Sequence, residues 1–162
     1  MIWLKWLLVV VVAVPVLLIL AGQAGLLTGA PPTDLGVRDG KLKGLSNTPN
    51  CVSSQAALYP DHPMRGYAQI APLAAKGDAV ATMAAVKAVV EGMDGVVVVT
   101  ATTDYVYARF TTKLLKFVDD VEFWFDPQTQ VVQVRSASRI GHGDRGVNRA
   151  RIEAVRRLLA AR

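Results

Sequence analysis

Polar side chains that could recognise a ligand are concentrated between residues 131 and 159. This stretch has the pattern of a buried strand, a glycine-containing loop and a closing helix. An arginine offers a planar fork of donors that fits carboxylates and phosphates. Residues 131–159 are therefore the first place to look for a site, and their polar groups near the expected core are Ser136, Ser138, Arg139, His142, Asp144, Asn148 and Arg151.

Arg151 is expected on the apolar face of the closing helix. At about 100° per residue it falls between Val147, Val155 and Leu158. A buried guanidinium costs several kcal/mol unless a carboxylate and further acceptors meet it. We therefore predict that Arg151 pairs with an acid of the sheet, and the candidates are Asp119, Asp120 and Glu122.

The strand before this helix alternates valine and serine on one side, so Ser136 and Ser138 should face the core with Val132 and Val134. Their hydroxyls need partners there, which Asn148 and Arg151 can supply. One interpretation is a structural network that locks the helix onto the sheet. The other is a polar pocket that recognises an anionic or carbonyl group, with the candidate binding residues Arg135, Ser136, Ser138, Arg139, Asn148, Arg151 and Glu122.

Catalysis has weaker candidates. Cys51 could form a thiol–imidazole–carboxylate set with His142 and Asp144, or with His62 and Asp61. The alternative is that Cys51 is a small buried side chain and that both histidines belong to loops. Cys51 and the two histidines lack the spacing of a metal site, so we expect neither a metal nor a cofactor.

The elements that must position these residues follow from periodicity and turn signals. A helix over 79–91 is expected with Asp78 as its cap, and a closing helix from about Asp144, also a cap, to about Ala160. A short edge strand is expected at Tyr67–Ile70, and short connections make the main strands antiparallel. The pattern predicts an α+β domain whose four- to five-stranded antiparallel sheet has two helices packed on one face, with main strands over residues 95–101, 104–112, 117–126 and 131–140.

A sheet with helices on one face leaves aromatic side chains such as Tyr105 and Tyr107 on the other. An exposed aromatic patch would mark a partner or lipid surface. We expect instead that the irregular segment 46–72, with its turn chemistry over Ser46–Ser54, covers this face.

Residues 1–22 are almost wholly apolar, and Lys5 is their only charge. A helix of about 17–25 apolar residues can span a bilayer, so residues 1–27 are expected to be an anchor that contacts the membrane through residues 2–22. The alternative is a cleaved signal peptide, since residues 22–24 offer small side chains at a suitable spacing. Residues 28–44, rich in glycine and proline, are expected to be a linker or extended arm, and residues 45–162 a single domain.

Charge bears on topology and partners. Lys5 favours a cytoplasmic amino terminus, whereas Arg38, Lys41 and Lys43 favour the opposite, and we expect the domain outside, in the periplasm at a bacterial inner membrane. The net charge of +5 suits anionic headgroups, and nucleic acid is not an expected partner there. Cys51 is the only cysteine, which excludes an internal disulfide.

Three groups of residues resemble the bacterial and plastid family called domain of unknown function 1499, over about Leu35–Leu159. They are Asn47–Ser54, Val118–Phe123, and Arg135–Arg139 followed by Asp144, Gly146–Arg149 and Arg151. The resemblance implies a membrane-anchored or exported domain. It brings no established activity, ligand or catalytic residue.

The sequence therefore favours a non-enzymatic envelope domain, tethered to the membrane, that binds a small amphiphile such as a lipid, or an envelope protein partner, through the region of Arg151 and Ser138. A Cys51-dependent enzyme acting on acyl or thiol groups is the second hypothesis, and a structural accessory protein is the third.

Overall fold

The computed structural model describes residues 2–162, without the side chains of Lys5 and Leu8. Met1 and the charge of Lys5, on which the expected topology rests, lie outside what is described. The elements in chain order are α1 (Ile2–Gln23), β1 (Cys51–Ser53), the 3-10 turn η1 (Ala56–Leu58), α2 (Arg65–Ala68), β2 (Leu73–Ala74), α3 (Ala79–Glu91), β3 (Val96–Ala101), β4 (Tyr105–Thr111), β5 (Val118–Asp126), β6 (Val131–Ser138) and α4 (Val147–Ala160).

The strands form one antiparallel sheet in the order β1-β6-β5-β4-β3, and the short β2 also pairs with β6. β3 to β6 are joined by short turns, so each pairs with its neighbour in sequence. β1 and β2 share the outer edge of β6, β1 opposite Arg135–Ala137 and β2 opposite Val131–Val132. The α+β class is confirmed, and the sheet has six strands where four to five were expected.

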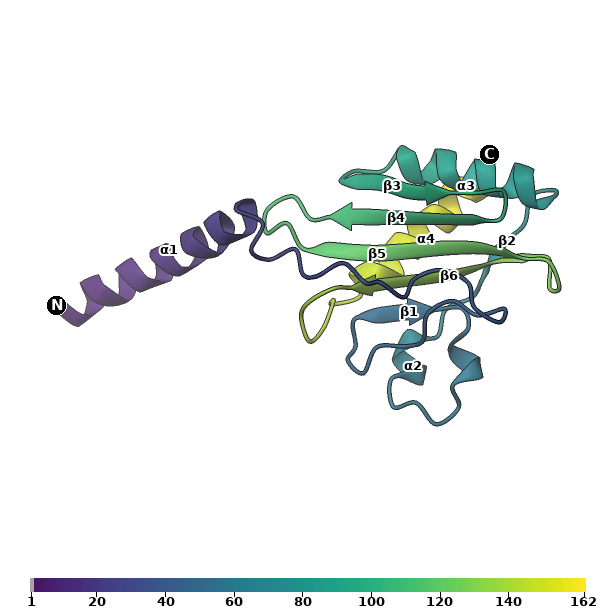
Figure 1. The fold of residues 1–162 in the computed structure, drawn as a ribbon. Helices are drawn as coiled ribbons and strands as arrows, with labels where there is room; N and C mark the ends of the chain where they lie inside the picture. Colours follow the sequence, from purple (N-terminus) through teal and green to yellow (C-terminus); the bar gives the residue numbers. More distant parts are fainter. Residues whose placement is uncertain (1) are drawn as a thin grey trace.

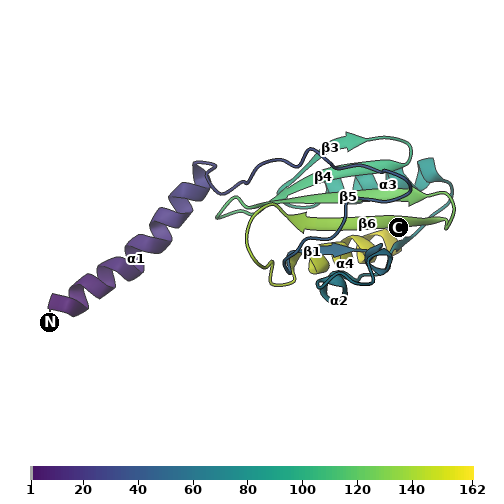
Figure 2. The ribbon, with the colours of Figure 1, turned by 60° about the horizontal axis from the view of Figure 1, so that its bottom comes forward.

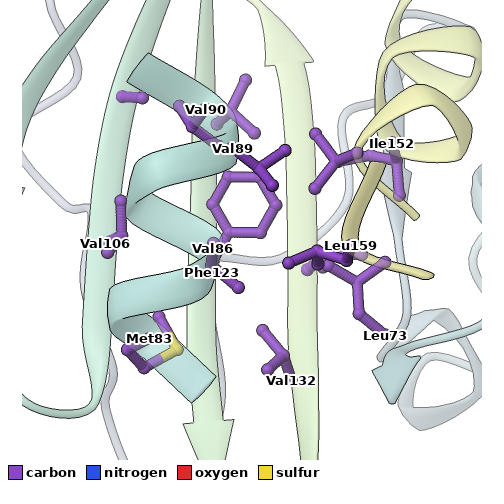
Figure 3. Packing of buried hydrophobic residues seen from close by; sticks show 14 of the residues in the cluster. Leu73, Met83, Val86, Val89, Val90, Val106, Phe123, Val132, Ile152 and Leu159 are labelled. Atoms are coloured by element: carbon purple, nitrogen blue, oxygen red, sulfur yellow. The ribbon is translucent and has the colours of Figure 1, made fainter. Parts of the chain in front are cut away.

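α3 and α4 pack on one face of the sheet (Figure 3). Asp78 begins α3 as predicted, because its Oδ1 accepts a hydrogen bond of 2.8 Å from the backbone of Ala81. The apolar side of each helix meets alternate residues of the strands, and Val86, Phe123 and Ile152 are all completely buried. This face holds the main hydrophobic core.

On the other face, residues 28–44, which we call the arm, run across the β5–β6 part of the sheet, whereas β3 remains largely exposed (Figures 1 and 2). Leu42 of the arm is 3% exposed. Gln55 holds the arm through both ends of its amide, accepting from the backbone of Leu42 at 2.8 Å and donating to the carbonyl of Gly40 at 2.9 Å. With helices behind and the arm in front, every residue of β5 is buried. The arm is therefore part of the packed domain and not a spacer.

Three expectations for the segments before α3 need correction. Tyr67 and Ala68 lie in α2, and of the expected edge strand only Gln69 pairs, in an isolated parallel bridge with Ser53. Cys51–Ser53 forms an edge strand inside the segment expected to be turns. Segment 46–72 was expected to cover the outer face alone, but the arm does so as well: a Cβ atom at Gly40 would lie 4.0 Å from the Trp124 ring, and Gly36 and Tyr105 both bond to Glu122.

α1 is long and apolar enough to cross a membrane, with a mean hydropathy of 2.8, and a secretion signal would share these properties. Its carboxyl end contacts the turn between β4 and β5. The Gln23 side chain donates to the carbonyls of Lys113 and Leu114 at 3.3 and 2.9 Å. A Cβ atom at Gly22 would meet the backbone of Leu115 at 2.5 Å, so this close approach requires glycine.

Shortening the Leu42 side chain to alanine should unfold the full-length protein more easily, by about 2–5 kcal/mol, because it removes a buried contact between arm and sheet. The measurement is urea unfolding in detergent micelles, followed by circular dichroism. Leu58→Ala serves as the matched control, since Leu58 is 49% exposed and should cost little. Equal stability of the two variants would mean that the arm does not pack.

Candidate functional site

Arg151 of α4 forms an ion pair with Asp119 of β5, with 2.5 Å between Nη2 and Oδ2. The two side chains are only 9% and 5% exposed. Asp119 reaches the helix because it lies on the same face of β5 as the core residues Val121 and Phe123. The guanidinium also lies over the Phe110 ring, 4.7 Å from its centre. The predicted buried ion pair is confirmed, with Asp119 as its acid.

Asn148 links this ion pair to the neighbouring strands. Its Oδ1 accepts from Arg151 Nη1 at 2.7 Å and from the Ser136 hydroxyl at 2.5 Å. Its Nδ2 donates to the Ser138 hydroxyl at 3.0 Å and to the carbonyl of Asn50 at 3.1 Å. Asn148 and Ser136 are completely buried, and the bonds of Asn148 to Ser136 and Asn50 are sheltered from water. The serines face the helix side as the alternation predicts.

Arg135, Arg139 and Glu122, which the sequence grouped with Arg151, lie on the opposite face of the sheet. Alternation along β5 and β6 places them under the arm. Arg139 pairs with Asp120 through two hydrogen bonds of 2.9 and 2.8 Å. Arg135 donates from Nε to the carbonyl of Gly44 at 3.1 Å. The expected binding set is therefore two separate clusters with the β-sheet between them.

Glu122 is the completely buried member of the outer cluster. Its Oε1 accepts from the backbone of Gly36 and from the Tyr105 hydroxyl, both at 2.8 Å. Its Oε2 lies 3.7 Å from Arg135 Nη1 and has no hydrogen-bond partner in residues 2–162. Burial raises the pKa of Glu122, although the Gly36 N–H, Arg135 and Tyr105 oppose the rise. Burial, with the Asp120 carboxylate, also raises the pKa of Tyr107 to about 12.

Asp144 was expected to cap α4, but the helix begins at Val147 with Gly146 as its N-cap, so Asp144 lies in the loop just before the helix. Its carboxylate accepts from the backbone of Gly146 and Asn148 at 3.0 Å each, and from the Tyr67 hydroxyl. Burial works to raise the pKa of Asp144, but the hydrogen bonds from Tyr67, Gly146 and Asn148 outweigh it and lower the pKa. Its carboxylate thus holds the loop before α4 to the first turn of that helix.

The structure does not join the candidate catalytic residues. Cys51 is 2% exposed, and its thiol lies beside the carbonyl of Val52 at 3.7 Å. His142 lies in an exposed loop, and His62 Nδ1 accepts from the backbone of Met64. Across residues 2–162, no hydrogen bond links Cys51 to a histidine, and no group of three potential ligands could hold a metal ion.

A hollow of about 750 Å³ opens beside Arg151, at the end of the domain where α1 joins. The buried Arg151 and Phe110 form part of its lining, together with the apolar Met93 and Val147. This volume suits a small-molecule ligand, for which about 300–1,000 Å³ is usual. Two lysines, Lys113 and Lys116, also line it, and both belong to the β4–β5 turn.

Sequence reasoning identified Arg151 at this hollow but missed the other lining residues. Met93 also packs partly against the core. The turn Lys113-Leu114-Leu115-Lys116 could have indicated a binding surface. Two leucines flanked by lysines in a turn are expected at the surface, where exposed apolar side chains often mark a contact. The position of the hollow depends on how α3, α4 and this turn pack against one another, and the periodicity of the sequence does not predict that packing.

Fold and site together define a single α+β domain with a buried polar network, joined to an apolar amino-terminal helix. Residues 41–159 match the family described as "Protein of unknown function (DUF1499)", so the chain belongs to that family. No curated protein and no solved structure matches the chain.

Replacing Asp119 by asparagine should destabilise the protein by about 3–5 kcal/mol, because it leaves the Arg151 charge buried without its counterion. Urea unfolding of the full-length chain measures the loss. The double change Asp119→Leu and Arg151→Met should cost clearly less than Asp119→Asn alone, since no charge then stays buried. The control is Lys87→Gln in the exposed pair with Glu91, worth about 0.3–0.5 kcal/mol. A loss from Asp119→Asn no larger than this control would contradict a buried pair.

Glu122→Gln should stabilise the protein relative to wild type by an amount that grows as pH rises above 4.5, the ordinary pKa of this side chain. The native carboxyl keeps its proton to higher pH than the unfolded one, so wild-type stability falls between the two pKa values. The difference between the urea midpoints of variant and wild type, measured from pH 4 to pH 8 in about one-unit steps, tests this.

Asp126 on the same strand provides a control of opposite sign. Burial works to raise the pKa of Asp126, but the hydrogen bonds from Thr129, Gln128 and Gln133 outweigh it and lower the pKa. Its stabilisation is present above the ordinary pKa and is lost as pH falls through the native one, so Asp126→Asn should cost most near neutral pH. A pH-independent difference for Glu122→Gln would show that the carboxyl titrates normally.

Proposed function

We propose that this protein is a non-enzymatic, membrane-anchored domain that binds a small anionic amphiphile in the hollow beside Arg151, on the periplasmic side of a bacterial inner membrane. The observation that carries the proposal is a buried guanidinium with unused donors at an apolar hollow. α1 supplies the anchor, and the α+β domain supplies the site.

The hydrogen bonding of Arg151 leaves capacity for a ligand. A guanidinium has five N–H groups, and Arg151 donates to Asp119, Ser136 and Asn148. Nε and one hydrogen of Nη2 have no acceptor among residues 2–162. The protein contacts hold the side chain in one orientation, so an incoming anion does not have to order it. A carboxylate or phosphate oxygen fits these donors.

The other lining groups suit the remainder of an amphiphile. Phe110, Met93 and Val147 offer apolar surface for a hydrocarbon segment. Lys113 and Lys116 add positive charge at the same hollow, against the single acid Asp94. Asp119 neutralises Arg151, so the two lysines supply the attraction that draws an anion in.

The contact between α1 and the domain supports an anchor over a cleaved signal peptide. Gln23 and Gly22 are fitted to the β4–β5 turn, and a mature protein without α1 would lose both contacts. The mass of the protein purified from its host membrane decides this point directly, because cleavage near residue 24 would remove the whole helix.

The full-length protein, extracted from its host membrane in mild detergent, should carry a bound anionic amphiphile in native mass spectrometry. Val147→Trp should reduce this occupancy, with binding of added lipid weakened at least about tenfold, or roughly 1.4 kcal/mol, because the indole fills part of the hollow. Val80→Trp is the matched control, since Val80 is an exposed valine near the start of α3 that does not line this hollow.

The alternatives predict other results. A reproducibly bound protein without lipid would favour assembly with an envelope partner. Equal lipid occupancy in wild type, Val147→Trp and Val80→Trp would mean that lipid binds elsewhere, on the detergent-exposed helix for example, and would reject the hollow as the site.

A further inference from the structure

Two loops lie at the end of the domain from which α1 departs (Figures 1 and 2). One is the β4–β5 turn, residues 112–117, and the other joins β6 to α4, residues 139–146. Neither loop is needed to close the core, because the core cluster contains no residue from them. Their exposed side chains therefore need another explanation.

The β4–β5 turn has a fixed position relative to α1. Gln23, the last residue of α1, donates to the carbonyls of Lys113 and Leu114, and Gly22 lies directly against the backbone of Leu115. A helix of 22 residues is about 33 Å long, close to the roughly 30 Å of a hydrocarbon core. When α1 spans a bilayer, its end at Gln23 lies at the membrane surface. The turn bound to Gln23 then lies among the lipid headgroups.

The chemistry of the two loops suits that location. Leu114 is 63% exposed and Ile140 is 36% exposed, although both are large apolar side chains. Basic side chains accompany them, namely Lys113 and Lys116 beside Leu114 and the exposed Arg145 beyond Ile140. Apolar side chains flanked by lysine or arginine are the composition of surfaces that lie at membrane interfaces.

The acids near these loops do not cancel that charge. Asp144 accepts hydrogen bonds from the backbone of Gly146 and Asn148 and from Tyr67. Asp120 is buried in its pair with Arg139. This leaves Asp94, next to the hollow, as the exposed acid against Lys113, Lys116 and Arg145. The surface carries a positive excess that complements an anionic bilayer.

We propose that loops 112–117 and 139–146 form a docking face for an anionic phospholipid bilayer, with Leu114 entering the interface and the lysines on headgroup phosphates. Lys113 and Lys116 belong to loop 112–117 and also line the hollow beside Arg151. When this face docks, the hollow therefore faces the same bilayer. The inference concerns the membrane surface and goes beyond ligand binding in the hollow.

The test uses the full-length protein in lipid nanodiscs, with a nitroxide spin label on a Leu114→Cys variant. Discs of phosphatidylcholine alone are compared with discs that also contain phosphatidylglycerol. In the anionic discs, the label at position 114 should become severalfold more accessible to oxygen relative to a water-soluble nickel chelate. Lys113→Gln with Lys116→Gln, or high salt, should reverse the change, since salt screens exposed charges.

Leu158→Cys is the matched control. Leu158 is 46% exposed and lies toward the far end of α4, near the carboxyl terminus (Figure 1). Its label should stay in water in both discs. Labelling of the wild-type protein checks that the buried Cys51 does not react.

Equal water accessibility of the labels at positions 114 and 158 in anionic discs would overturn the docking face. Entry of the label at position 114 into both kinds of disc to the same extent would overturn the role of anionic headgroups. Val147→Trp separates this inference from the proposed function. It should exclude the ligand from the hollow without changing the accessibility of the label at position 114.

Discussion

The ion pair between Arg151 and Asp119 is the interaction on which the arrangement of α4 against the sheet depends. Neither charge is tolerable alone at this depth, since an unpaired ion in the interior costs several kcal/mol. Asn148 and Ser136 complete the hydrogen bonding and extend it to β6 and to the residue before β1. One guanidinium thus fixes the register of helix, central strand and edge strand, which apolar packing alone would leave less specific.

A second polar cluster on the opposite face also joins buried acids to hydrogen-bond partners, here including the arm. There the buried acids of β5 meet arginines of β6, tyrosines of β4 and the backbone of the arm. The backbone N–H of Gly36 donates to Glu122. This hydrogen bond holds the arm in place, and the arm in turn covers Glu122. One face of the sheet is therefore covered by helices, and part of the other is covered by seventeen residues that contain no helix or long strand.

The regular elements were predictable from sequence because their signals are local. α3 was predicted with its observed bounds, and each of the four main strands was placed to within about two residues, the usual uncertainty at element ends. The Arg151 ion pair was predictable because a buried charge on an apolar helix face is costly unless an opposite charge pairs with it. Its acid was not, since neighbouring residues 119 and 120 point to opposite faces and the register decides between them.

Other features could not be predicted because they depend on tertiary contacts. Residues 28–44 have the composition of a flexible spacer, and only the fit of Leu42 and Gly36 onto the sheet makes them part of the domain. The same holds for β1, a strand of three residues whose pairing with β6 no local pattern indicates. The hollow likewise arises where three elements distant in sequence meet.

The route of the arm determines how far the domain can lie from the end of α1. Residues 24–35 are the only stretch between the end of α1 and the first backbone bond to Glu122. The helix end is itself fastened to the β4–β5 turn. When α1 spans a bilayer, this fastening keeps the domain close to the membrane surface, and a partner has to reach it there.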